Sequence, residues 1–137
     1  MAYATLKYEA LKNFSHEVFQ KMGYTAEEAE IITDVLLTSD LYGIESHGMQ
    51  RMVRYYKSIK NGRLVLGAEK EVVFETPVSA VIDGHDGTGQ LLGHYAMSLA
   101  IEKAKKNGIG IVTVRNSNHY GIAGYYAKMA ADEGLLG

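Results

Sequence analysis

The first residues of the chain carry apolar positions at the spacing of an amphipathic helix. The pattern predicts a helix over residues 6–22, because apolar side chains recur every four residues. They form one predicted apolar face: Leu6, Ala10, Phe14, Val18 and Met22. Gly23 follows directly, and glycine commonly ends a helix in the left-handed conformation.

Two further helices are predicted before residue 65. Thr25 begins the second helix, because Glu28, three residues later, completes the pattern of a capping box. Apolar residues form its predicted buried stripe: Ile32, Val35 and Leu36. We expect this helix to end at Gly43. The third helix begins near Ser46, a preferred N-cap residue, and stops at Asn61-Gly62.

From residue 66 onward the pattern changes to short strands alternating with helices. Strands are predicted at Glu71–Glu75 and 79–83, and a long helix follows a glycine-rich loop. Lysines are expected in the last turn of that helix, where positive charge suits its dipole: Lys103, Lys105 and Lys106. The largely apolar run 109–114 predicts a buried strand. A polar loop, 115–121, leads to a last helix over 122–133, so the order is three helices followed by β-β-α-β-α, an α/β fold class.

The composition narrows the classes of protein to which the chain can belong. Hydrophobic residues make up 47% and charged residues 22%, as in a globular protein. The net charge of -2 gives no electrostatic footprint for nucleic acid. Without cysteine there are no disulfides, thiolate nucleophiles or zinc–cysteine sites. No apolar run approaches the roughly 20 residues that span a bilayer, and the start of the chain lacks the pattern of a signal peptide. We therefore expect a cytoplasmic protein with no nucleic-acid or membrane partner.

Residues 43–51 begin the first group of chemically capable side chains. His47 lies in the first turn of the predicted third helix, and Arg51 and Tyr55 follow at four-residue intervals on the same face. Arginine binds a carboxylate through two parallel hydrogen bonds, and histidine exchanges a proton with a hydroxyl or carbonyl oxygen. Ser46 and the N–H groups of a helix start add further donors. A capping serine beside ordinary surface residues would give the same local pattern.

A second group lies between the predicted apolar strand and the last helix. Polar side chains at the carboxyl end of a strand, next to a helix start, commonly contact ligands. Asn118 and His119 can each hydrogen-bond a substrate or an amide, and Gly121 lets a backbone approach closely. A polar turn with a capping residue is the structural alternative.

The glycine-rich loop at residues 84–89 is interpreted as a structural turn. It does not match Gly-x-Gly-x-x-Gly, because Leu92 stands where the third glycine is required, and the next strand ends at Arg115 instead of an acidic residue. Acidic and histidine side chains near this loop match no standard metal-ligand spacing, so no metal site is predicted. They are Asp83, His85, Asp86 and His94.

Taken together, three motifs resemble the type-2 malate/L-lactate dehydrogenase family, which is distinct from the Rossmann-fold lactate dehydrogenases. They are Ser46-His47-Gly48 with Arg51 and Tyr55, Asp83-Gly84-x-x-Gly87-x-Gly89-Gln90, and Ser117-Asn118-His119-Tyr120-Gly121-x-x-Gly124. The resemblance covers essentially the whole chain, and the order and spacing of the motifs are more specific than any one motif. The family includes ureidoglycolate, sulfolactate and diketogulonate oxidoreductases and an imino-acid reductase.

The resemblance implies an N-terminal helical segment, residues 1–65, and part of a non-Rossmann mixed-sheet α/β cofactor domain, residues 66–137, in a homodimer. It implies hydride transfer between NAD or NADP and C2 of a small 2-hydroxy or 2-oxo acid. The implied proton donor and acceptor is His119, with His47 as polariser or alternate acid. Substrate-binding roles are implied in the first motif for Ser46, Arg51 and Tyr55. Cofactor-binding roles are implied in the third motif for Asn118 and Gly121.

Members of this family are much longer than the present chain, so the resemblance implies that part of the cofactor site lies beyond Gly137. We therefore expect an N-terminal fragment that contributes half of a site. One alternative is a truncated, non-catalytic remnant that binds a partner chain or a small acid. Another is a different nucleotide-binding α/β domain that uses the glycine turn at residues 84–89.

Overall fold

Residues 5–137, which the computed structural model describes, form a layer of helices beside an α/β layer. The expectation about a signal peptide falls partly on residues 1–4, outside the described residues. The elements are α1 (Tyr8–Met22), α2 (Ala26–Leu41), the 3₁₀ turns η1 (Glu45–His47) and η2 (Met49–Arg51), α3 (Met52–Lys60), β1 (Glu71–Glu75), β2 (Ser79–Gly87), α4 (Gly89–Asn107), β3 (Ile111–Ser117) and α5 (Ala123–Asp132). The predicted order of three helices followed by β-β-α-β-α is confirmed.

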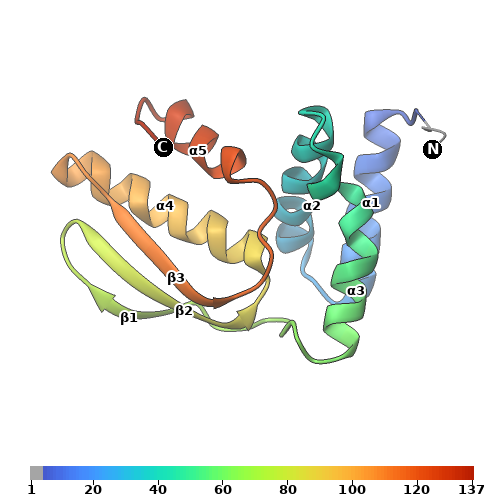
Figure 1. Cartoon of the computed structure of the whole chain (residues 1–137), viewed down its shortest axis with the longest axis horizontal. Coiled ribbons are helices and arrows are strands. Elements are labelled where there is room, and N and C mark those ends of the chain that lie inside the picture. The colour runs from blue at the N-terminus through green and yellow to red at the C-terminus, as the bar shows by residue number, and fades with distance from the viewer. Residues whose placement is uncertain (1–4) are drawn as a thin grey trace.

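The two layers meet along α2 and the start of α4. In Figure 1, α1, α2 and α3 lie side by side at one end of the molecule, and the sheet lies at the other. Helix α4 packs on β2 and β3, and α5 packs on α4 and reaches α2. The loop that follows β3 passes close to α2, so it brings residues near 119 toward the helical layer.

Two hydrophobic cores hold these layers together. Of two consecutive residues of α4, one belongs to the first core and the next belongs to the second. The first core joins the helical layer to Leu91 and contains Phe19, Tyr24, Ala29, Ile32, Leu36 and Tyr55. The second lies between the sheet and α4 and contains Ile82, Leu92 and Ala96. The first turn of α4 is therefore fixed from both sides, because its two leucines are buried in opposite directions.

The helix predicted at residues 6–22 begins two residues later, at Tyr8. Its predicted apolar face was only partly right, because Met22 packs against the first core but other members do not. Leu6 and Phe14 are 64% and 57% exposed, whereas Ser15 and Phe19 are buried. Thr33 Oγ1 of α2 donates to Ser15 Oγ at 3.2 Å. A hydrogen-bonded polar pair can be buried where two helices meet. Helix α2 therefore packs on the face of α1 that contains Ser15 and Phe19, each one residue after a position of the predicted apolar face.

The second helix follows the local sequence signals closely. Glu28 N donates to Thr25 Oγ1 and Thr25 N donates to Glu28 Oε2, so the predicted capping box is confirmed. The predicted stripe is buried as well. The helix ends at Leu41, two residues before the predicted stop at Gly43.

The single helix predicted from Ser46 was wrong at its start. Two 3₁₀ turns precede α3, and Ser46 makes no capping bond. Asp40 of α2 causes the interruption: its Oδ2 accepts from Met49 N at 2.9 Å. A Cβ at Gly48 would lie 1.8 Å from Asp40 Oδ1, so a larger residue there would displace this carboxylate from its hydrogen bond.

The sheet is mixed, with strand order β1-β2-β3. Strands β1 and β2 pair antiparallel, and β2 and β3 pair parallel. The predicted α/β class with a mixed sheet is confirmed. Within residues 5–137 the third strand is not buried as predicted, because β3 is an edge strand there and Ile111 is 54% exposed. Helix α4 covers only one of its faces.

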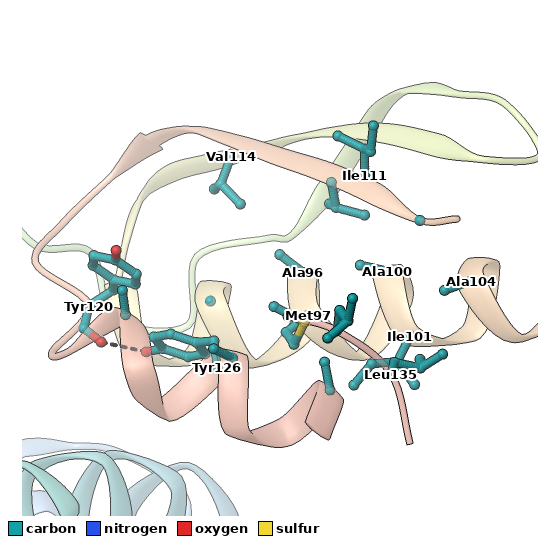
Figure 2. A pocket seen from close by; sticks show the side chains of 18 of the residues that line it. Ala96, Met97, Ala100, Ile101, Ala104, Ile111, Val114, Tyr120, Tyr126 and Leu135 are labelled. Atoms are coloured by element: carbon teal, nitrogen blue, oxygen red, sulfur yellow. Dashed lines mark hydrogen bonds between the residues drawn. The ribbon is translucent and has the colours of Figure 1, made fainter. Parts of the chain in front are cut away.

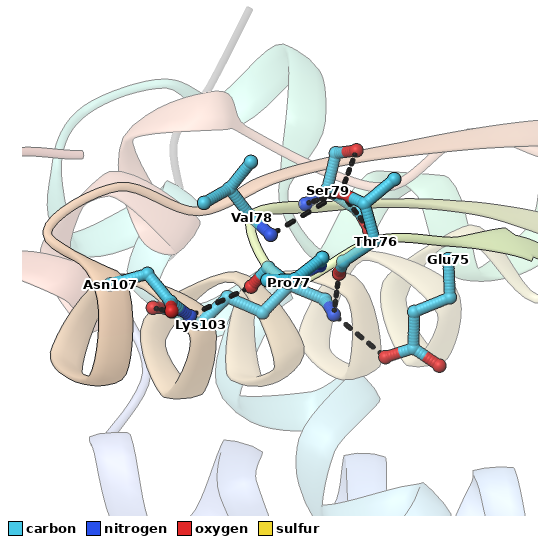
Figure 3. A network of polar contacts seen from close by, with 7 residues as sticks. All are labelled: Glu75, Thr76, Pro77, Val78, Ser79, Lys103 and Asn107. Carbon is cyan, nitrogen blue, oxygen red and sulfur yellow. Dashed lines mark hydrogen bonds and ion pairs between the residues drawn. The ribbon is translucent and has the colours of Figure 1, made fainter.

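Lys103 does not lie in the last turn of α4 as predicted but is buried beneath the turn between β1 and β2. Figure 3 shows its ammonium donating to Glu75 Oε1 at 2.7 Å and to Thr76 O at 2.8 Å. Asn107 Nδ2 donates to Pro77 O at 2.8 Å in the same network. The hairpin is therefore tied to α4 by charge-assisted hydrogen bonds.

We expect Lys103→Ala to lower the free energy of unfolding by about 2 kcal/mol, because two hydrogen bonds of a buried ammonium are lost. Urea denaturation measures the change. Lys106→Ala, at an exposed position of the same helix, is the matched control and should change stability by less than about 0.5 kcal/mol. Equal effects of the two variants would show that the network contributes nothing beyond a surface lysine.

Candidate active site

Four side chains of the predicted site meet where the loop after β3 reaches the helical layer. Tyr55 Oη and His119 Nδ1 are 2.8 Å apart. The rings of His47 and His119 have centroids 5.2 Å apart, at an interplanar angle of 30°. Arg51 is close enough to act electrostatically on His119. These four residues, His47, Arg51, Tyr55 and His119, are called the histidine cluster below.

Close backbone packing on α4 brings His119 to the cluster. A Cβ at Gly89 would lie 2.2 Å from Asn118 O and 2.4 Å from His119 O, so the loop rests directly on the first turn of the helix. Asn118 Nδ2 donates to Asp86 O at 2.7 Å and to Gly87 O at 3.1 Å. The loops that follow the parallel strands β2 and β3 are thereby fixed to each other.

Asp83 organises the carboxyl ends of β2 and β3. Its carboxylate accepts from Arg115 Nε at 2.8 Å, from Asn116 Nδ2 at 3.0 Å and from His85 N at 3.0 Å. These donors, the Asn116 side chain first, lower the pKa of Asp83 to about 2. His85, Asp86 and Asn116 all have positive φ angles, which non-glycine residues adopt only when the surrounding structure holds them.

The hydrogen bonds of His119 determine which ring nitrogen carries the proton. Gly121 N donates to Nδ1 at 3.3 Å, so Nδ1 is an acceptor and the hydroxyl of Tyr55 donates to it as well. The proton of the neutral ring is therefore on Nε2. That atom is buried, and among residues 5–137 it has no hydrogen-bond partner. A buried N–H without a partner costs about 1–3 kcal/mol, which a ligand oxygen would recover.

Burial and nearby positive charge keep His119 neutral. Desolvation is the largest cause, followed by Arg51, His47 and Arg54, and together they lower its pKa to about 4. Burial raises the pKa of Tyr55 to about 12, although the same two arginines oppose the rise. The cluster is therefore an uncharged imidazole–phenol pair in a positive field, which favours an anionic ligand.

The other predicted site residues lie beside the cluster but make contacts within the fold. Ser46 Oγ and His47 Nδ1 are 2.9 Å apart, and Arg51 Nε donates to Ser46 O. The Asn118 amide nitrogen is engaged by backbone carbonyls, as described above. Gly121 has φ of 87°, and a Cβ there would lie 2.4 Å from Val35 Cγ1. At these two positions the described contacts are structural.

Sequence reasoning gave no site role to three residues that shape this region. Asp40 interrupts the third helix, Asp83 was considered as a metal ligand and as a member of a motif, and Gln90 was only one member of the same motif. Gln90 is fully buried, and neither of its amide atoms has a hydrogen-bond partner among residues 5–137. Its sequence position could have identified Gln90, because a polar residue there stands directly between Gly89 and the two leucines Leu91 and Leu92.

A cleft of about 1200 Å³ opens between α4, β3 and α5 (Figure 2). Its walls are mainly small and apolar, including Ala96, Ala100 and Val114. Ser117, Asn118 and Tyr120 line one end, whereas no side chain of the histidine cluster does. The large cleft and the buried acid–base groups are therefore adjacent but distinct parts of the molecule.

Two further features of the described residues bear on function. Within residues 5–137, no three histidine, aspartate or glutamate side chains gather in a way that could hold a metal ion. No helix in that range has the length and apolar character needed to cross a membrane.

Comparison with known proteins identifies the family. The sequence profile described as Malate/L-lactate dehydrogenase matches residues 6–137. The chain belongs to the malate/L-lactate dehydrogenase family. The resemblance inferred from the three motifs is thus confirmed.

Individual members of the malate/L-lactate dehydrogenase family match almost all of the chain. Malate dehydrogenase from Pyrococcus abyssi is 51% identical over 135 residues, which are 98% of this chain and 37% of that protein. L-sulfolactate dehydrogenase from Methanocaldococcus jannaschii is 43% identical over 132 residues, 96% of this chain and 38% of that protein. The structure of malate dehydrogenase from Pyrococcus horikoshii OT3 superposes with a TM-score of 0.94 at 50% identity and covers 96% of this chain and 38% of that one. The chain thus spans well under half the length of these relatives.

The unusual environment of His119 has a measurable consequence for this family member. We expect its NMR titration midpoint near the pKa of about 4, and Arg51→Met should raise it because a positive charge is removed. Lys57→Met, at an exposed position of α3, is the control and should leave the midpoint unchanged.

Because the folded pKa of His119 lies below the ordinary value of 6.5, the unfolded chain binds the proton first as the pH falls. The stability that neutral His119 contributes is therefore lost between about pH 6.5 and 4. A midpoint at or above 6.5 would contradict the buried, positively surrounded geometry.

Proposed function

We propose that the protein bearing this chain is an NAD(P)-dependent oxidoreductase that interconverts a small 2-hydroxy acid and its 2-oxo acid. Membership of the malate/L-lactate dehydrogenase family supports this reaction class. The observation that carries the proposal is the buried Nε2 of His119, which lacks a partner among residues 5–137 and lies in a field made positive by Arg51 and Arg54.

The histidine cluster has the groups that this chemistry needs at the substrate. His119 Nε2–H would donate to the C2 oxygen, and His47 would polarise the same oxygen from the adjacent ring. Arg51, with Ser46 and Tyr55 in support, would bind the carboxylate that every such acid carries. In the reductive direction C2 gains a hydride and the oxygen gains the proton, while the oxidative direction reverses both transfers.

The described residues fit the part of a nicotinamide site that faces the substrate, but they do not fit the part that would bind the phosphates of the dinucleotide. The buried donor of His119 suits a carbonyl oxygen that becomes more basic as hydride arrives, which is the chemistry that a bound nicotinamide supplies. Asn118 and Gly121 would stand at the nicotinamide end. The cleft has no lysine or arginine in its lining, so residues 5–137 offer no cationic side chain there for the phosphates. No step is therefore derived for the dinucleotide, and NAD and NADP stay equal candidates.

We make further proposals about domains, assembly, location and partners. Residues 1–65 would be the N-terminal helical segment, and residues 66–137 would belong to the cofactor domain. The protein would act as a homodimer, in the cytoplasm, on a free small-molecule acid. We propose no nucleic-acid or membrane partner.

The proposal is tested by the oxidation of NADH and of NADPH against a panel of 2-oxo acids that includes oxaloacetate and pyruvate. The protein that bears this chain should turn over at least one pair, and His119→Ala should lower kcat by about 100-fold or more, because a positioned acid–base group is lost. His16→Ala, on α1 and outside the histidine cluster, is the control and should retain full activity. Absence of turnover in the unaltered protein would favour a non-catalytic protein that binds a partner or a small acid.

A further inference from the structure

Gln90 is a fully buried polar side chain that the proposed function does not use. Its side-chain nitrogen and oxygen are both buried, and neither has a hydrogen-bond partner among residues 5–137. Buried polar groups are nearly always paired, so an amide with two unpartnered atoms requires an explanation. A structural role alone does not explain it, because methionine or leucine would fill the same space without the cost of burying an amide.

The fold holds Gln90 beside the histidine cluster. It lies in the first turn of α4, between Gly89, on which the His119 backbone rests, and Leu91, which shares a core with Tyr55. Its amide is near enough to the Tyr55 oxygen to lower the pKa of the phenol, although burial has the larger and opposite effect. The amide nevertheless stands outside hydrogen-bonding geometry. Rotation about the side-chain torsions is the movement by which the amide would reach Tyr55 Oη.

The Tyr55 hydroxyl has one proton and can accept as well as donate. Because Nδ1 of His119 already accepts from Gly121 N, the Tyr55 proton must point toward Nδ1 for the pair to be satisfied. If the hydroxyl turned away, only the 3.3 Å bond from Gly121 N would hold Nδ1 as an acceptor, and the tautomer that lacks the Nε2 donor would become easier to populate. A donor to the Tyr55 oxygen would oppose this turn, and Gln90 is a neighbouring side chain that carries an amide N–H.

We propose that Gln90 is a positioning residue that donates to Tyr55 Oη when substrate is bound and so fixes the direction of the Tyr55–His119 hydrogen bond. This inference rests on the proposed function and deepens it. The hydrogen bonds then run in one direction, from the Gln90 amide to Tyr55, from Tyr55 to Nδ1 of His119, and from Nε2 to the substrate oxygen.

The same arrangement explains how a neutral histidine can supply a proton. When the alkoxide forms at C2, the Nε2–H bond breaks and an O–H bond forms on the substrate. The O–H bond of Tyr55 breaks as an N–H bond forms at Nδ1, so the imidazole stays neutral throughout. The negative charge then rests on the Tyr55 oxygen. Burial disfavours this charge, and the Gln90 amide and the field of Arg51 and Arg54 offset part of that cost. A proton taken up from solvent, the one that the overall reduction consumes, restores the phenol.

The test is Gln90→Met, which keeps the length of the side chain but removes its donor and acceptor. Leu91→Met, at the next buried position of the same turn, is the matched control. Three quantities are measured for each variant: the ¹⁵N chemical shifts of His119 with and without oxalate as an anionic probe, kcat and KM with a 2-oxo acid, and the urea midpoint.

For Gln90→Met we expect the ¹⁵N shifts with oxalate to move from a single Nε2–H tautomer toward a mixture. We expect kcat to fall about 10- to 100-fold with KM changed less than about threefold, because the substrate contacts remain. The urea midpoint should be unchanged or higher, since two unpartnered buried atoms have been removed. Leu91→Met should leave the shifts and kcat unchanged. In a Tyr55→Phe background the Gln90 substitution should have no further effect on the tautomer.

Unchanged ¹⁵N shifts in Gln90→Met would overturn the proposal, as would a large fall in the urea midpoint, which would show that the amide is bonded within the fold. These outcomes are separable from failure of the proposed function. The shifts report on His119 without any turnover, whereas an inactive unaltered protein with the expected shifts would reject the dehydrogenase reaction alone.

Discussion

The hydrogen bond between Tyr55 and His119 joins the two layers of this protein at the candidate active site. The partners are 64 residues apart in sequence and come from α3 and from the loop after β3. Each is held independently, Tyr55 by the core of the helical layer and His119 by the packing of its loop on the start of α4. The distance between them therefore depends on how the two layers pack together. Leu91 and Leu92 of α4 connect the layers, because each is buried in a different core.

Burial at this joint sets the chemistry of the cluster. A histidine in water would be partly charged near neutral pH, whereas desolvation and two nearby arginines keep His119 uncharged with its donor on Nε2. The backbone at the ends of β2 and β3 contributes to the same site. Asp83 holds Asn116, which has a positive φ angle, at the start of the loop that carries His119. An uncharged donor in a positive field is suited to a carbonyl oxygen beside a carboxylate.

The accuracy of sequence reasoning here depended on how local each signal was. The capping box of Thr25 and Glu28 involves four consecutive residues and was predicted correctly, as was the order of the elements. The face of the first helix, the start of the third and the position of Lys103 were wrong, because a partner from another element decides each one. His47, Arg51, Tyr55 and His119 were named together from motifs, yet the contact that joins Tyr55 to His119 could not be derived from spacing. Gln90 was missed as a site residue because its significance lies in the absence of partners, which only a three-dimensional structure reveals.

A double-mutant cycle on the unfolding free energy tests the central hydrogen bond most directly. Tyr55→Phe, His119→Leu and the double variant are compared with the unaltered protein by urea denaturation. A bond that joins the layers as described gives a coupling energy of about 1 kcal/mol, so the double variant is less destabilised than the sum of the single ones. Additivity within about 0.3 kcal/mol would mean that Tyr55 and His119 do not interact, and the site would have to be assembled in another way.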